Sequence, residues 1–189
     1  MPFGSLWLPV VVSAVVVWLL SSVLHMVLKY HRADYKPLPD EEAVGAALRK
    51  DAPAPAVYTI PYCDDMAQMK ETAFQEKYRR GPVAIVKVMK SEPPAMGKFL
   101  GLWFLFCLLV SFTAAYVARN SLSFDALGTK VMQITGTVAF AGYGYGALID
   151  WIWGGDPLPN VLRALLDALL YALATGAVFW WLWPGAPLG

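Results

Sequence analysis

Three ionisable side chains lie within otherwise apolar stretches of this sequence: His25, Asp150 and Asp167. An ionisable group inside a membrane span is costly, and by default it indicates a functional site with a partner. A histidine with two carboxylates can pass protons, bind a cation or hold a metal ion. Placed along their helices by the rise per residue, all three groups lie at a similar depth, close to one side of the membrane.

The same residues also have a purely structural explanation. Arg163 lies four residues before Asp167 on the same helical face, so it can pair with Asp167 or with Asp150. All these groups are expected within about 10 Å of the interface, where water and snorkelling lower their cost. We expect the candidate polar cluster of His25, Asp150, Arg163 and Asp167 to fix helix register, with proton or cation handling as the alternative.

The sequence predicts no cofactor, no metal ion and no catalytic residue. His31 follows His25 by six residues, which does not place two imidazoles on one helix face, and the chain has two histidines in all. Cys63, Asp64 and Asp65 match no standard metal spacing, and an Asp pair before a helix is usually a cap. Signatures of Walker, HExxH, GxSxG or kinase type are missing from the sequence.

Four apolar stretches must position the polar residues, at 6–28, 99–118, 131–153 and 161–183. The chain is 58% hydrophobic and 15% charged, whereas soluble domains average about 25% charged residues. At a rise of about 1.5 Å per residue, each stretch can cross a hydrocarbon core. We therefore expect an all-α integral membrane protein, a single membrane domain with a bundle of four transmembrane helices.

The third stretch, 131–153, is expected to be the central helix of that bundle. Thr135, Ala139, Gly142 and Gly146 follow one another at spacings of four, three and four, which predicts a smooth stripe down one helical face. Small residues at such spacings let membrane helices approach closely. Asp150 continues the same face, so it is expected to point at a neighbouring helix.

Residues 29–98 form the one long polar stretch, with 12 of the 15 lysines and arginines and 10 of the 14 acids. Within it we expect a helix over 40–50 and a second helix from Asp64 or Asp65 to Arg80. Two β-branched stretches, 57–60 and 83–89, are expected to pair as strands. The sequence thus predicts a mixed segment between the first and second spans.

The positions of basic residues predict the orientation in the membrane. They crowd both flanks of the long polar stretch: Lys29, Arg32 and Lys36 at one end, and Lys87, Lys90 and Lys98 at the other. The stretches outside the first and fourth spans carry no lysine or arginine. By the positive-inside rule, residues 29–98 are expected in the cytoplasm and both termini outside.

Two stretches, LPDEEAVGAALR at 38–49 and GPVAIVKVMKSEPPAMGKFLGLWF at 81–104, carry a resemblance to known proteins. Together they resemble an uncharacterised family of small bacterial inner-membrane proteins. The resemblance implies four spans and a bacterial inner (plasma) membrane location, and it implies no activity, cofactor or site residue.

Three classes of function follow from these patterns. The first is a non-enzymatic accessory or scaffold subunit that packs through small-residue helix faces against other membrane subunits or copies of itself. The second is a small oligomeric transporter or channel for protons, cations or a small solute. The third is a membrane enzyme acting on lipid or quinone at the inner interface. A net charge of +1 gives no basic field for nucleic acid, so the bilayer is the expected surrounding.

Overall fold

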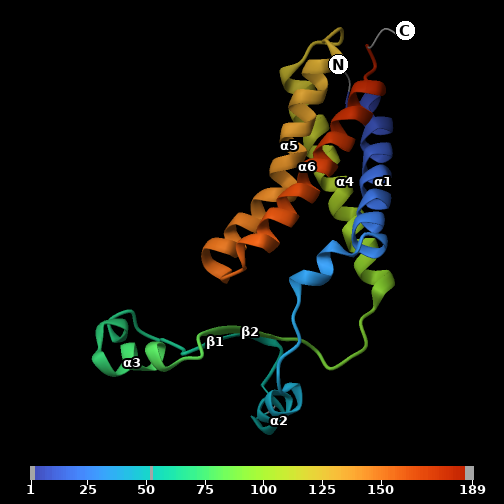
Figure 1. Ribbon diagram of the computed structural model, residues 1–189. Coiled ribbons are helices and arrows are strands. Elements are labelled where there is room, and N and C mark those ends of the chain that lie inside the picture. The colour runs from blue at the N-terminus through green and yellow to red at the C-terminus, as the bar shows by residue number, and fades with distance from the viewer. Residues whose placement is uncertain (1–2, 52, 186–189) are drawn as a thin grey trace. The chain divides into compact units, whose positions relative to one another are not determined.

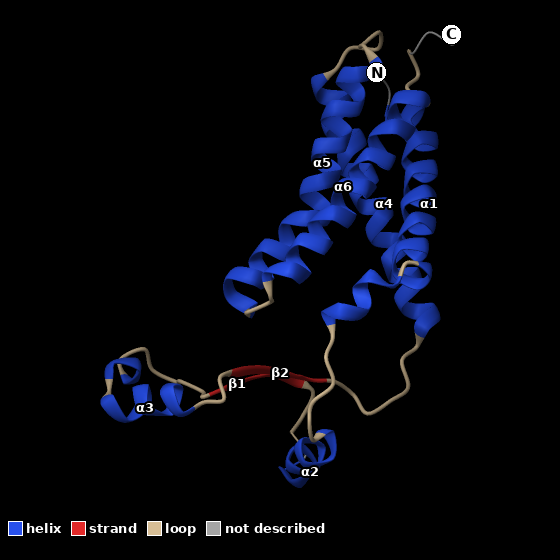
Figure 2. Ribbon diagram, viewed as in Figure 1, coloured by secondary structure: helices blue, strands red, loops and turns tan. Residues whose placement is uncertain are grey.

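The computed structural model describes residues 3–51 and 53–185 of the chain, and most of them are helical (Figures 1 and 2). The chain divides into two compact units. The larger unit comprises the described parts of Met1–Tyr35 and Ala95–Gly189, and the smaller unit is Lys36–Pro94. Each unit is described below by itself.

Four long helices make up the larger unit: α1 (Trp7–Ser22), α4 (Met96–Ser121), α5 (Gly128–Ile149) and α6 (Leu158–Trp181). Each helix packs against two others, in the cyclic order α1, α4, α5, α6. Short pieces flank them, with a 3-10 helix, Phe3–Leu6, before α1 and a π-helical turn, Val23–Val27, after it. A second 3-10 helix, η3 (Lys29–Asp34), follows that turn.

Three helical segments of the larger unit are long and apolar enough to cross a membrane: Gly4–Val27, Met96–Ser121 and Leu158–Trp181. They correspond to the predicted spans 6–28, 99–118 and 161–183. Large apolar side chains such as Leu19, Leu109 and Leu173 are exposed on these helices. Exposed leucines in such numbers suit a hydrocarbon surrounding, so the larger unit is compatible with an all-α membrane protein.

The predicted central helix, 131–153, begins earlier and ends earlier than expected. Its regular part is α5, Gly128–Ile149, and a π-helical turn, Asp150–Gly154, follows. Gly155 then adopts a left-handed φ of 77°, which ends the helix. Glycines, threonines, Lys130 and Gln133 lower its hydropathy, and α5 is not among the described helices that are apolar enough to cross a membrane.

Polar side chains join α1 to α4 inside the larger unit. The Ser13 hydroxyl donates to the Ser111 hydroxyl at 2.9 Å, and both residues are fully buried. The Trp103 indole N–H donates to the Ser21 hydroxyl at 2.7 Å, and the Trp18 indole N–H donates to the Leu100 carbonyl at 3.1 Å. These bonds satisfy polar groups that apolar surroundings would otherwise leave unpaired.

The predicted small-residue stripe is only partly a packing face. Thr135 and Ala139 are fully buried, and a Cβ added to Gly142 would lie 3.1 Å from a Val110 methyl group of α4. Contrary to the prediction, nothing lies within 4 Å of a Cβ added to Gly146. The stripe therefore turns away from its neighbours before it reaches Asp150, because a straight helix cannot keep one face against a partner that diverges.

Other glycines bring α5 and α6 together. A Cβ at Gly136 would lie 3.3 Å from the Ala172 carbonyl oxygen, and a Cβ at Gly176 would lie 2.9 Å from the Met132 carbonyl oxygen. Backbone atoms cannot move aside as a flexible side chain does. The two helices thus approach through glycine on both sides, one on α5 and one on α6.

The smaller unit contains a two-stranded antiparallel sheet and two helices: α2 (Glu41–Asp51), β1 (Ala56–Ile60), α3 (Thr72–Arg80) and β2 (Ala84–Val88). In the sheet, Ala56 pairs with Val88 and Ile60 with Ala84, which confirms the predicted pairing. The Asp40 carboxylate accepts the Ala43 N–H at 2.9 Å and caps α2.

The second helix of the polar stretch starts later than predicted. Asp65 accepts the Ala67 N–H at 2.9 Å, so it caps a turn that leads into a 3-10 helix, Gln68–Lys70. Glu71 then has an extended backbone, and α3 begins at Thr72. The prediction of one helix from Asp64 or Asp65 to Arg80 was wrong, because the Asp65 side chain caps the turn before the 3-10 helix Gln68–Lys70 and not α3.

A glycine-to-alanine pair tests which stripe holds α5 against α6. We expect Gly176→Ala to lower the free energy of unfolding by about 1–3 kcal/mol, because the new methyl group meets the Met132 backbone. Gly146→Ala, the matched control, meets open space and gains helix propensity, so its stability should be equal or higher. Unfolding in detergent micelles measures both. A larger loss for Gly146→Ala would restore the stripe predicted from sequence.

Candidate functional site

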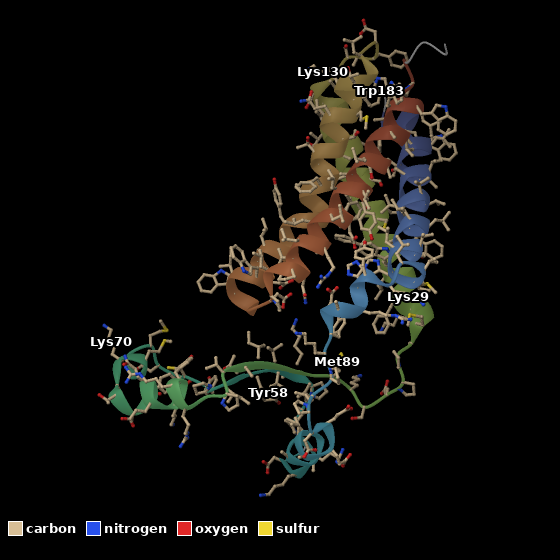
Figure 3. All side chains as sticks on the ribbon, in the orientation of Figure 1. Lys29, Tyr58, Lys70, Met89, Lys130 and Trp183 are labelled. Atoms are coloured by element: carbon tan, nitrogen blue, oxygen red, sulfur yellow. The ribbon has the colours of Figure 1, made fainter. Side chains whose placement is uncertain are left out.

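A change of chain direction after α1 brings the two histidines together. The π-helical turn Val23–Val27 ends α1, Leu28 is extended with φ −83° and ψ 115°, and η3 runs from Lys29. Lys29 is labelled at this bend in Figure 3. The His25 and His31 rings stack there with their centroids 4.3 Å apart and their planes within 9°. The prediction that they lie on different faces was wrong, because no continuous helix joins them.

Asp167 of α6 lies at the centre of the resulting cluster. Its side chain is 6% exposed, and its Oδ2 lies 2.8 Å from His31 Nε2 and 3.7 Å from His25 Nε2. Its Oδ1 accepts a hydrogen bond from the Tyr30 hydroxyl. The cluster therefore joins α6 to the chain segment that follows α1.

A second layer of polar groups holds the two imidazoles. His25 Nδ1 lies 3.0 Å from the Ser21 carbonyl oxygen, and His31 Nδ1 lies 2.6 Å from Asp34 Oδ2. A carbonyl or carboxylate oxygen can only accept, so both Nδ1 atoms carry the proton and donate. Both Nε2 atoms are consequently the ones that face Asp167.

Arg163 completes this second layer from α6. Its Nε donates to Asp34 Oδ1 at 2.6 Å, and its guanidinium also donates to Asn160 Oδ1 at 2.8 Å. Burial acts to raise the pKa of the Asp34 carboxyl, but hydrogen bonds from His31 and Arg163 outweigh it and hold that pKa below its usual value. Asp34 is therefore charged at neutral pH. Burial and the hydrogen bond to Asp167 raise the pKa of Tyr30, which keeps its hydroxyl protonated.

The four residues predicted as a polar cluster do not all meet. His25 lies beside Asp167, but Arg163 pairs with Asp34 and not with Asp167 or Asp150, because η3 inserts Asp34 next to it. Asp150 is exposed on its π-helical turn, and no ion pair joins it to another residue of the described chain.

Sequence reasoning missed three members of the site: Tyr30, His31 and Asp34. A histidine and an aspartate three residues apart, as in His31 and Asp34, are within reach of each other on a short helix, and this was the available signal. The position of the bend was not readable from hydropathy, because the apolar stretch continues through it to Leu28.

A cavity of about 400 Å³ adjoins the cluster inside the larger unit. It is lined by residues of α1 and the turn after it, α4, α5 and α6: Ser21, Ser22, His25, Met26, Met96, Leu100, Trp103, Tyr143, Ala164, Asp167 and Tyr171. His25 and Asp167 form one polar side of it, and aromatic rings form another. The Trp103 and Tyr171 ring centroids are 6.2 Å apart, and those of Tyr143 and Tyr171 are 5.3 Å apart.

Two buried hydroxyls of the cavity lining, those of Tyr143 and Tyr171, have no hydrogen-bond partner among the described residues. Tyr171 is 3% exposed, and its hydroxyl makes no hydrogen bond to any residue that the structure describes. A buried hydroxyl without a bond is costly, so such a group usually faces a water or a ligand. The cavity thus offers a donor at Tyr171 in addition to the polar side at His25 and Asp167.

Comparisons with protein families, with curated proteins and with solved structures found no match to this chain. The function is therefore argued below from its own residues.

A pair of tyrosine variants tests the cluster's geometry. We expect Tyr30→Phe to lower the free energy of unfolding by about 1.5–3 kcal/mol, because the buried Asp167 carboxylate loses a donor. Tyr35→Phe is the matched control, since Tyr35 is 87% exposed and should change stability little. Thermal or denaturant unfolding in micelles measures both. Equal effects of the two variants would contradict the hydrogen bond from Tyr30 to Asp167.

Proposed function

We propose that this chain is a multi-pass membrane protein that binds a quinone-class amphiphile in the cavity beside Asp167. The observation that carries the proposal is the composition of this cavity, which is lined by the ionisable pair His25 and Asp167 and by aromatic rings packed edge to face. Mostly apolar cavities with a few convergent polar groups are the usual form of small-molecule sites. This corresponds to the third class of function, a membrane enzyme acting on lipid or quinone.

The walls suit a flat ring with polar oxygens better than a phospholipid headgroup. Trp103 and Tyr171 offer ring faces and edges against which a planar ring packs. The Tyr171 hydroxyl can donate a hydrogen bond to a ring carbonyl, and His25 Nε2 can accept a hydrogen bond from a ring hydroxyl. Arg163, the cation nearest to Asp167 along α6, is engaged with Asp34, so it is not available for a phosphate.

The apolar margin of the cavity suits the tail of such a molecule. Met26 and Met96 line the cavity and are themselves 76% and 61% exposed. A hydrocarbon chain can leave the cavity between them and enter the surrounding lipid. Methionine side chains are flexible and adapt to chains of different shape.

The membrane arrangement that we propose adds α5 as a fourth span to the three apolar helices. Its length supports this, since 22 residues at about 1.5 Å each cover a hydrocarbon core. Basic residues support residues 29–98 on the cytoplasmic side and both termini outside. The resemblance to small bacterial proteins supports an inner-membrane location. The binding site then lies near the inner interface.

Titration with decylubiquinone tests the proposal. The protein, in micelles with EDTA present, is expected to bind saturably, with quenching of tryptophan fluorescence through Trp103. Ala164→Phe fills the cavity from α6 and should raise Kd at least tenfold, or about 1.4 kcal/mol. Leu162→Phe is the matched control, because Leu162 is 57% exposed and outside the cavity lining, and its Kd should be unchanged.

Two results would contradict this function. Equal affinity of wild type and Ala164→Phe would place the quinone elsewhere, most simply in the micelle. No saturable binding by wild type, with other membrane proteins retained after mild extraction, would favour the accessory-subunit function. That function, with other subunits or a homo-oligomer as partner, stays a prediction.

A further inference from the structure

We propose that His25, His31 and Asp167 bind one divalent transition-metal ion. Their ligand atoms, His25 Nε2, His31 Nε2 and Asp167 Oδ2, all lie within 4.8 Å of one another. At tetrahedral angles, an ion about 2.0–2.2 Å from each ligand places neighbouring ligand atoms about 3.3–3.6 Å apart. The observed 2.8 and 3.7 Å from Oδ2 to the two Nε2 atoms bracket that spacing. The His25 side chain is 50% exposed, and its ring has to rotate out of the nearly parallel stack on His31 before its Nε2 reaches the same ion.

The protonation of the imidazoles points the right atoms at the ion. Both Nδ1 atoms donate, to the Ser21 carbonyl and to Asp34, so in neutral rings both Nε2 atoms present lone pairs towards Asp167. Two lone pairs and a carboxylate oxygen repel one another unless a cation or a proton lies between them. A histidine ligand whose other nitrogen donates to a carboxylate or carbonyl is the usual arrangement in metal sites.

The charge balance also calls for a cation at this point. Asp34 has Arg163 as its counter-ion, whereas the ion pairs of Asp167 within the described chain are with the two histidines alone. If both rings are neutral, a buried carboxylate remains without a full positive charge beside it, which is costly. A divalent ion supplies that charge, and Tyr30 leaves Oδ2 available because it bonds Oδ1.

The ligand set indicates which class of ion fits. Two imidazole nitrogens and one carboxylate oxygen suit Zn²⁺, Fe²⁺, Co²⁺ or Mn²⁺, whereas Mg²⁺ and Ca²⁺ prefer oxygen ligands alone. Three protein ligands leave at least one coordination position open, as in catalytic metal sites. His25 and Asp167 also line the cavity, so an open position can face it.

The helix irregularity at the site supports a functional origin. The π-helical turn Val23–Val27 contains His25 and ends with the reversal that delivers His31. Such π-helical turns within helices occur frequently at functional sites. An unbroken α1 would carry His31 away from His25, so the irregularity is what assembles the three ligands.

A cobalt and zinc titration tests this site, with no quinone added and with an affinity tag that contains no histidine. The protein has only the two histidines, so every imidazole signal belongs to the site. We expect one Co²⁺ per chain, with visible d–d absorption bands that Zn²⁺ abolishes by competition. Asp167→Asn and His25→Gln should each weaken Zn²⁺ binding at least tenfold. His25→Gln is the safer of the two for folding, because that side chain is half exposed.

Asp150→Asn is the matched control, since Asp150 is an exposed carboxylate outside the cluster and its loss should leave Zn²⁺ affinity unchanged. Circular dichroism and gel filtration establish that each variant is folded. The proposal is overturned if folded wild type binds no stoichiometric Co²⁺ or Zn²⁺, or if folded His25→Gln and Asp167→Asn bind as tightly as wild type. The first result would identify the cluster as a protonated histidine–carboxylate pair.

The metal site does not depend on the proposed quinone. Decylubiquinone titration is carried out in EDTA and metal titration without quinone, so each can fail alone. Saturable quinone binding without Co²⁺ binding would remove the metal and keep the cavity's function. Metal binding without quinone binding would keep the metal site and remove the proposed quinone function.

Discussion

The larger unit is organised around one buried carboxylate. Asp167 lies in the middle of an apolar helix with its side chain 6% exposed, and a charge in that position requires partners at close range. The helices that pack beside α6 supply few such groups, since their buried polar residues are serine and threonine. The partners come instead from the chain after α1, which bends at Val23–Val27 and returns Tyr30 and His31 to α6. Asp34, brought by the same bend, engages Arg163 one helical turn from Asp167.

Close packing and the cavity are two consequences of how small residues are distributed on α6. Where α6 presents Ala172 and Gly176 to α5, the backbones approach until a methyl group no longer fits. Where it presents Ala164 and Tyr171, the small side chain does not fill the space between helices, and the large ring forms a wall. Hydrogen bonds and buried serines hold α1 against α4 on the far side of that space. The cavity therefore lies among helices that pack closely elsewhere along their length.

Hydropathy predicted the three most apolar helices to within a few residues, because a long apolar run has few alternatives. The packing face of α5 was less predictable. Two stripes of small residues run along this helix, one through Thr135 and Gly142 and one through Gly136 and Gly144, and composition does not rank them. Which of the two stripes packs closely depends on α6, whose Ala172 backbone lies against Gly136. Small-residue patterns indicate that a helix packs closely, but its partner decides which face does so.

The candidate site was predictable in its residue types and not in its assembly. His25 and Asp167 were identifiable as ionisable groups in apolar stretches, and they do meet. His31 was placed on a different helix face from His25 because periodicity assumes a continuous helix, and the π-helical turn breaks that assumption. Arg163 was assigned to the wrong carboxylate because Asp34 was counted in the polar stretch. Each error concerns the end of a helix, where sequence periodicity carries the least information.

A polar network whose only role was to fix the helix register would need fewer groups than the cluster around Asp167 contains. The Tyr30 hydroxyl already donates to Asp167 Oδ1, and His31 Nε2 already lies 2.8 Å from Oδ2. His25 adds a second imidazole, stacked on the first and half exposed, at 3.7 Å from the carboxylate. An exposed ring at that distance contributes little to stability, since exposed charge pairs are weak. Its Nδ1 is nevertheless held by Ser21 and its Nε2 is directed to Asp167, beside the cavity. This orientation, with little gain in stability, supports the metal site proposed above over a purely structural contact.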